Sequence, residues 1–170
     1  MNKTERRLYI PAAILLASFL GVPAANAQSS CPYSNASIQG NYAVVGNYTG
    51  GIALAFGVEN FDGQGNLTRK AMVNAPTTGS TTGARTLTST SSTGTYTVNC
   101  DGTGVYARVL TNLTTGVMTK SVSDFVITGA VTSFNGVLIA TSIVDAQETP
   151  SIIVAGGVFV FYLHTRLPNQ

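Results

Sequence analysis

The sequence predicts an all-β protein in which eight antiparallel strands form an up-and-down meander barrel. No stretch shows a sustained helical period, and segments rich in Val, Ile, Tyr and Phe recur between Gly, Asn, Asp and Pro. The links between these segments are mostly short, which makes consecutive strands antiparallel neighbours. Closure into a barrel removes exposed strand edges, whereas a two-sheet β-sandwich, the alternative, leaves them.

A secretory signal precedes the predicted strands. Three basic residues within the first seven positions are followed by an apolar stretch over 10–22 and by small residues up to Ala27. The apolar stretch is shorter than the roughly 20 residues of a membrane-spanning helix. We therefore expect a signal peptide over 1–27, a single barrel domain over 28–170 with no membrane span after cleavage, and a secreted or periplasmic protein.

Charge is balanced once this leader is set aside. Three of the nine Lys and Arg residues and one of the seven Asp and Glu residues lie in the leader, so six of each sign remain. A neutral chain with scattered basic residues lacks the electrostatic footprint of a nucleic-acid or anionic-lipid binder. The sequence therefore predicts no nucleic-acid partner.

Two cysteines, Cys31 and Cys100, remain after the leader. In an exported protein an even pair of cysteines predicts a disulfide, here closing a loop of about 70 residues. A metal site would need more ligands than two thiols, and His164 is the only histidine of the chain. We expect no metal site and a disulfide that ties the start of the domain to its middle.

The strands are expected in the following order. They span residues 40–46, 51–61, 66–74, 93–99, 105–112, 119–128, 136–145 and 151–165, with a weaker strand over 85–90. Small polar residues predict loops over 76–83 and 89–93. In the last expected strand, the pair Gly156-Gly157 predicts a bulge or a sharp bend.

The last expected strands are apolar on both faces, notably over 137–140, 143–144 and 158–163. A half-exposed strand should alternate apolar and polar residues, so both faces are expected to be covered. The barrel interior would cover one face, and a loop, a partner subunit or a membrane the other. A homo-oligomer is therefore an open alternative, whereas an outer-membrane barrel is disfavoured because the chain has no Trp for aromatic girdles.

Two copies of one motif, NFDGQG over 60–65 and NCDGTG over 99–104, stand between expected strands. Oxygen-bearing residues at alternate positions and a glycine at position six are typical of calcium loops. The twelfth position, however, is Ala71 in one copy and Leu110 in the other, where a calcium loop needs a bidentate Glu. We therefore interpret both motifs as hairpin turns, in which Asp accepts backbone hydrogen bonds and Gly adopts a positive φ.

The stretches GNYAVVG, FDGQGN and GTYTVNCDGTG resemble the motifs of small exported bacterial β-barrel proteins, most of them uncharacterised. Those proteins are similar in outline to eight-stranded barrels of the calycin or allene-oxide-cyclase type. The resemblance covers residues 40–104. It implies the barrel architecture and supplies no catalytic residues, because the shared motifs are turns.

No residue set predicts catalysis. His164 could act as a general base with Asp145 or Glu148, but its position at a strand end favours a ring in water. The chain has neither a nucleophile elbow nor a glycine-rich phosphate loop between a strand and a helix. No catalytic residue and no cofactor are therefore assigned.

Arg108, Asp124 and Tyr106 are the candidate ligand-binding residues, since each lies within an expected strand. If the faces that carry them point inward, Arg108 and Asp124 could pair and orient a ligand in an apolar cavity. An outward, solvated position is the simpler expectation for both charged residues.

The sequence thus favours a secreted, non-catalytic barrel that binds a small apolar ligand. Two alternatives remain open, namely an isomerase- or cyclase-type barrel enzyme and an extracellular structural or assembly subunit. The enzyme alternative rests on fold-level analogy alone.

Overall fold

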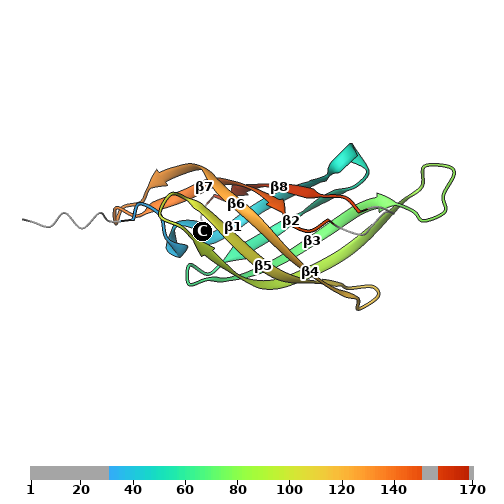
Figure 1. The fold of residues 1–170 in the computed structure, drawn as a ribbon, viewed down its shortest axis with the longest axis horizontal. Helices are drawn as coiled ribbons and strands as arrows, with labels where there is room; N and C mark the ends of the chain where they lie inside the picture. Colours follow the sequence, from blue (N-terminus) through green and yellow to red (C-terminus); the bar gives the residue numbers. More distant parts are fainter. Residues whose placement is uncertain (1–30, 151–156, 169–170) are drawn as a thin grey trace, which may run out of the picture. The chain divides into compact units, whose positions relative to one another are not determined.

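The computed structural model describes residues 31–150 and 157–168, which form a closed antiparallel barrel (Figure 1). Each strand pairs with its neighbours along the chain, and β1 pairs with β8 to close the barrel. The predicted meander barrel is confirmed, and the sandwich alternative is wrong. The elements are η1 Asn35–Ile38, β1 Gly40–Tyr48, η2 Thr49–Gly51, β2 Leu54–Phe61, β3 Asn66–Pro76, β4 Arg85–Val98, β5 Thr103–Asn112, β6 Met118–Thr132, β7 Leu138–Gln147 and β8 Val160–Arg166.

Two of the sequence predictions concern residues that the structure does not describe. They are the predicted signal peptide over 1–27 and the first residues of the last expected strand, 151–156. Within the described region β8 begins at Val160. Gly157, which precedes it, has a φ of 73°, a left-handed value that glycine adopts readily.

One loop prediction is wrong, because β4 runs unbroken through residues 89–93. Thr90 pairs with Ala71 of β3 on one side and with Asn112 of β5 on the other. Thr90 and Ser92 are buried in the barrel. Two neighbouring strands and an interior position thus impose an extended backbone on a stretch whose composition alone suggests a loop.

Two apolar clusters fill the barrel from its two ends. The cluster at the end that carries η1, here called the closed end, consists of Ile38, Tyr42, Phe61, Leu67, Tyr96, Tyr106, Phe125, Ala140 and Ile143. The cluster at the other end, the open end, consists of Val44, Tyr48, Ala53, Ala55, Val160 and Tyr162. Besides buried serines and Thr90, the described interior holds five acidic, basic or histidine side chains, which are Glu59, Arg69, Arg108, Asp145 and His164.

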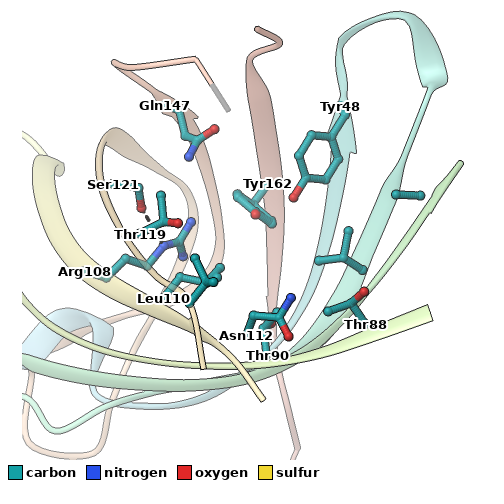
Figure 2. Close-up of a pocket in the computed structure, with 13 residues that line it drawn as sticks. Tyr48, Thr88, Thr90, Arg108, Leu110, Asn112, Thr119, Ser121, Gln147 and Tyr162 are labelled. Atoms are coloured by element: carbon teal, nitrogen blue, oxygen red, sulfur yellow. Dashed lines mark hydrogen bonds between the residues drawn. The ribbon is translucent and has the colours of Figure 1, made fainter. Parts of the chain in front are cut away.

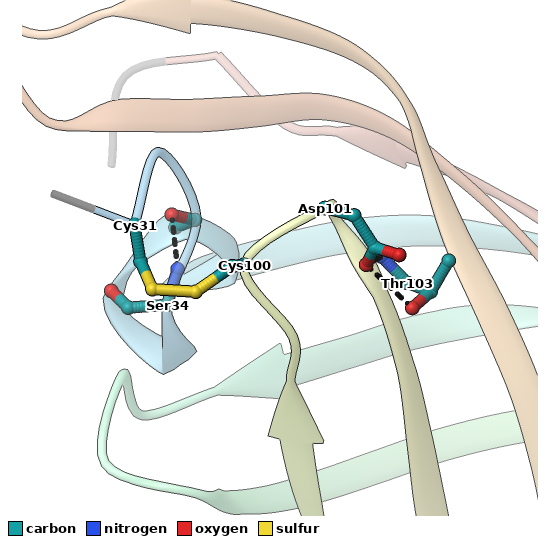
Figure 3. The surroundings of a disulfide bond; sticks show 6 residues. Cys31, Ser34, Cys100, Asp101 and Thr103 are labelled. Atoms are coloured by element: carbon teal, nitrogen blue, oxygen red, sulfur yellow. Dashed lines mark hydrogen bonds between the residues drawn. A yellow bond between two sulfur atoms is a disulfide. The ribbon is translucent and has the colours of Figure 1, made fainter. Parts of the chain in front are cut away.

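The segment with η1 plugs the closed end of the barrel. Ile38 is fully buried there, and the Asn35 side chain accepts a hydrogen bond of 2.9 Å from the Val98 amide. The predicted disulfide between Cys31 and Cys100 is present and joins this segment to the turn between β4 and β5 (Figure 3). The disulfide joins two residues that are 69 positions apart in the sequence, and the covalent loop that it closes restricts the unfolded chain.

Both Asp-Gly motifs are hairpin turns, as the sequence predicts. Asp62 Oδ1 accepts hydrogen bonds from the backbone N–H groups of Gln64 at 2.7 Å and Asn66 at 2.9 Å. Asp101 Oδ1 accepts from the backbone N–H of Thr103 at 3.0 Å (Figure 3). The glycines that follow have left-handed φ values, 81° at Gly63 and 85° at Gly102.

Candidate functional site

The open end of the barrel holds a cavity of about 240 Å³ (Figure 2). Its outer rim includes the exposed Val117 and Thr119, so the cavity opens to solvent. The link between β3 and β4, green in Figure 1, lies at this end, opposite the blue η1 segment. The lining comes from every strand except β2 and from the β5–β6 turn, and consists of Tyr48, Val73, Ala75, Thr88, Thr90, Arg108, Leu110, Asn112, Val117, Thr119, Ser121, Gln147 and Tyr162.

Arg108 and Tyr162 form the inner wall of the cavity, and both side chains are buried. The guanidinium of Arg108 points toward the space between the strands (Figure 2). Its Nε donates to Ser121 Oγ at 3.1 Å, and its Nη1 lies 3.4 Å from Glu59 Oε1. Its carbon Cζ is 5.0 Å from the centroid of the Tyr162 ring, a distance at which a cation interacts with an aromatic face. These contacts fix the cation at the inner end of the cavity.

An ionic layer lies behind this wall, made of Glu59, Asp145 and His164 together with Arg108. His164 Nε2 is 2.6 Å from Asp145 Oδ2, and its Nδ1 is 3.3 Å from Glu59 Oε2. The hydroxyl of Tyr106 donates to the same Asp145 oxygen. Each charged side chain of the layer is at most 1% exposed, so water does not screen these contacts.

Hydrogen bonds satisfy His164 only in part within this layer. Its Nε2 pairs with Asp145 Oδ2, whereas its Nδ1 and Glu59 Oε2, although 3.3 Å apart, have no hydrogen-bond partner among the described residues. Neither His164 nor these carboxylates line the cavity.

Arg69 is a second buried cation beside the wall. Its Cζ lies 4.1 Å from the centroid of the Tyr162 ring, and Glu59 faces it directly across the β2–β3 ladder. Its Nε and Nη1 are buried and have no hydrogen-bond partner among the described residues. The aromatic face of Tyr162 therefore holds the Arg69 guanidinium in place.

Burial keeps Tyr106 and Tyr48 protonated. Burial raises the pKa of Tyr106 well above its ordinary value, and the charges of Asp145 and Glu59 add to this. Burial also raises the pKa of Tyr48, with a further contribution from Tyr162. For Arg108, burial lowers the pKa, but Tyr106, Glu59, Tyr162 and Asp145 together raise it above its ordinary value. The cavity therefore presents the permanent cation of Arg108 and the neutral phenol of Tyr48.

The structure separates the three candidate ligand-binding residues. Arg108 lines the cavity, and Tyr106 is buried beneath it with its ring 5.0 Å from the Arg108 Cζ. Asp124 lies on the outer face of β6 and is exposed, so the considered pair between Arg108 and Asp124 does not form. The expectation that Arg108 faces solvent is wrong, because it shares its inward face with Tyr106 and finds carboxylate partners inside the barrel.

The prediction for His164 is also wrong. Its ring was expected in water at a frayed strand end, but the residue is 1% exposed. β8 pairs with β1 through Arg166, so His164 lies within the ladder rather than at its end. Of the two carboxylates considered as its partner, Asp145 is in contact with it.

Sequence reasoning missed Glu59, Arg69, Tyr48 and Tyr162 as residues of this region. The sequence did carry a signal for Glu59, because this residue alternates in step with Ala55 and Phe61, which point inward from the same strand. Tyr162 and His164 likewise alternate with the outward Phe161 and Leu163. Strand alternation therefore identifies these side chains as interior once one residue of each strand is known to point inward.

Three further observations bound the site. Within residues 31–150 and 157–168, no group of three or more His, Cys, Asp or Glu side chains is arranged to hold a metal ion. No helix in the described part of the chain is both long and apolar enough to cross a membrane. No protein-family model matches this chain, and no match emerges among curated proteins or solved structures.

Proposed function

We propose that this barrel binds a small, largely apolar ligand in the cavity at its open end, with an acidic group of the ligand against Arg108. The observation that carries the proposal is the position of Arg108. Among the five acidic, basic and histidine side chains that the described residues bury, Glu59, Arg69, Arg108, Asp145 and His164, it alone lines the cavity. A guanidinium presents several N–H donors in one plane, which suits a carboxylate.

The cavity walls favour an apolar body for this ligand. Val73, Ala75, Leu110 and Val117 supply apolar surface, while threonine hydroxyls supply a few polar contacts. Pockets for drug-sized ligands span roughly 300–1,000 Å³, and this cavity measures about 240 Å³. The ligand is therefore small, or part of it remains outside the open end.

The same geometry favours binding over catalysis. A general acid or base must reach the reacting atom within hydrogen-bond distance. Glu59, Asp145 and His164 stand behind Arg108 and Tyr162 and do not line the cavity. A ligand in the cavity would meet the fixed cation of Arg108 and the phenol of Tyr48, which burial holds protonated.

An isomerase- or cyclase-type enzyme is the second candidate. The contact of 2.6 Å between His164 and Asp145, in a layer that includes Arg108, favours it. Turnover would need a substrate that reaches past Tyr162 to this pair. Loss of turnover in His164→Gln without loss of ligand binding would support this candidate over a carrier.

We propose that the protein acts outside the cytoplasm. The Cys31–Cys100 disulfide supports this, because structural disulfides persist in oxidising compartments. The predicted signal peptide supports it independently. N-terminal sequencing of the protein from an exporting host would test the expected start at Gln28.

A matched ligand series tests the binding proposal. Hexanoate, hexanol and hexylamine share one apolar chain and differ in the end group, and each can compete with an apolar fluorescent probe. We expect hexanoate to compete best and hexylamine worst, because the cation at the wall attracts one end group and repels the other. Equal competition by all three would refute the role of Arg108, and no competition by any would refute the binding site.

Two substitutions on one strand provide the structural control. Thr88 lines the cavity from β4, whereas its neighbour Ser89 is exposed on the outer face. Thr88→Phe should fill the cavity and abolish probe binding, while Ser89→Phe should leave binding intact. Probe binding retained in Thr88→Phe would place the ligand elsewhere on the protein.

A further inference from the structure

Six large apolar side chains gather on the outer faces of β8, β1 and β2. They are Val45, Leu54, Phe56, Val58, Phe161 and Leu163, here called the apolar face. Each is between 43% and 54% exposed. The sequence predicts that the outer face of these last strands is covered, yet the described residues leave it open to solvent.

The apolar face is continuous across the strand pair that closes the barrel. Val45 of β1 lies directly opposite Leu163 of β8 on one side and Phe56 of β2 on the other. One register step away, Phe161 and Leu54 flank Asn47 in the same way. Side chains directly opposite on one face are in contact range, so the six form one surface.

No charged side chain interrupts this surface within the three strands, and Lys70 of β3, exposed directly opposite Val58, stands at its edge. The remaining outward positions of the three strands are Asn41, Ala43, Asn47, Asn60 and Thr165. Glu59 points into the barrel, and the Arg166 guanidinium turns to the Gln39 carbonyl and the Tyr42 hydroxyl. An uncharged face gives no electrostatic preference for a nucleic acid or a charged protein.

The apolar face is large enough to form the core of one side of a protein interface. Six side chains that each expose about half of roughly 150–200 Å² present on the order of 500 Å² of apolar surface. That lies in the upper part of the range of the largest patch on typical monomers, roughly 300–600 Å². A standard interface buries about 800 Å² per partner, including a polar rim such as the asparagines here.

We infer that the apolar face is the contact surface of a symmetric dimer of this chain. A two-fold interface places the same patch on both subunits, so the patch must be complementary to itself. An apolar sheet face meets this condition, because two copies that meet around Val45 bring no like charges together at the centre, and Lys70 stays at the rim beside Val58. Sheets stack face to face at about 10 Å through such side chains. The two-fold axis would pass near Val45, the centre of the face.

This inference is independent of ligand binding, because the apolar face lies outside the barrel and the cavity inside. Sedimentation equilibrium of the protein, expressed as the complete chain and purified from an exporting host, tests it directly. We expect a dimer at micromolar concentration that persists in high salt, since no ion pairs hold it. A monomer at all concentrations overturns the inference, whether its apolar face is bare or covered by another segment of the same chain.

Matched lysine substitutions locate the interface. Val45→Lys places two like charges at the centre of the dimer and should weaken association at least about a hundredfold. Val105→Lys, at an exposed outward position of β5, introduces the same charge away from the face and should leave the dimer intact. Equal effects of the two substitutions would refute this surface as the interface.

A milder pair protects the test against loss of folding. Val45→Thr keeps the shape and the strand preference of the residue but adds a hydroxyl to the centre of the face. It should weaken the dimer while circular dichroism shows an intact barrel, and Val105→Thr should not. An unchanged dimer in both Val45→Thr and Val45→Lys would overturn the inference.

Discussion

Gly46 of β1 and Tyr162 of β8 face each other across the strand pair that closes the barrel. The Tyr162 ring occupies the space that a side chain at position 46 would need. No positive φ constrains Gly46, so the glycine is required for space alone. This relationship connects closure of the barrel with the cavity, because Tyr162 forms the inner wall of the cavity.

Gly46→Ala is expected to destabilise the barrel by about 1–3 kcal/mol, the usual cost of overpacking a filled core. It should also weaken probe binding, because the displaced Tyr162 ring enters the cavity. Urea unfolding and probe titration measure the two effects. Combining Gly46→Ala with Tyr162→Leu should recover part of the lost stability, and a Gly46→Ala protein identical to wild type would contradict the packing described here.

The buried pair of Arg108 and Glu59 should behave as a unit. Arg108→Met leaves a carboxylate buried without its cation, which typically costs about 3–5 kcal/mol. The double variant Glu59→Gln with Arg108→Met removes both charges and should lose less than the two single variants together. Urea unfolding of all four proteins gives the coupling, and simple additivity would show that the 3.4 Å contact contributes nothing.

Calcium should not stabilise the protein. Asp62 already accepts hydrogen bonds from two backbone N–H groups and from the Asn66 side chain, so its oxygens are engaged within the turn. Thermal unfolding with calcium and with chelator should give the same midpoint. Asp62→Ala should lower the midpoint equally in both conditions, and Asp124→Ala, at an exposed position of β6, is the control. A calcium-dependent rise that Asp62→Ala abolishes would establish a metal loop.

Alkaline pH should destabilise the barrel through its buried tyrosines. Burial raises the pKa of Tyr106 well above the value of 10.0 for an ordinary tyrosine. Because the folded-state pKa is raised, the stability linked to Tyr106 is complete below pH 10 and is lost as the pH rises through the folded-state pKa. Tyr106→Phe should reduce this alkaline loss.

Phenolate absorbance and circular dichroism, followed together, provide the measurement. Burial also raises the pKa of Tyr42, Tyr48 and Tyr96. Phenolate formation at these residues should therefore coincide with loss of the barrel signal. Full ionisation of Tyr42, Tyr48, Tyr96 and Tyr106 in an intact barrel would contradict the burial of these rings.

Local chemistry made much of this fold predictable. Asp62-Gly63 and Asp101-Gly102 mark their turns because aspartate and glycine stabilise the backbone geometry of a hairpin. The pairing of Cys31 with Cys100 follows from there being no other cysteine. Residues 89–93 are the counterexample, since their small polar side chains suit a loop and only the flanking strands β3 and β5 hold them extended.

The ionic layer was not predictable in the same way. Glu59 and Arg108 are 49 residues apart, and Asp145 and His164 are 19 apart. Alternation along each strand shows that Arg108 shares a face with Tyr106, but not that this face points inward. In isolation, a charged residue in a strand is expected in water, because the cost of burial is offset only by partners on other strands.

By itself, then, the sequence determined the β class, the meander order, the marked turns and the disulfide, because each depends on residues close in the chain or on a unique pairing. The tertiary structure alone decided that Arg108 and His164 face inward, that a cavity ends at Arg108 and Tyr162, and that an uncharged apolar face covers β8, β1 and β2. The physical reason is closure of the barrel. Pairing β1 with β8 sets which face of every strand becomes interior, and it brings together charges that no local pattern connects.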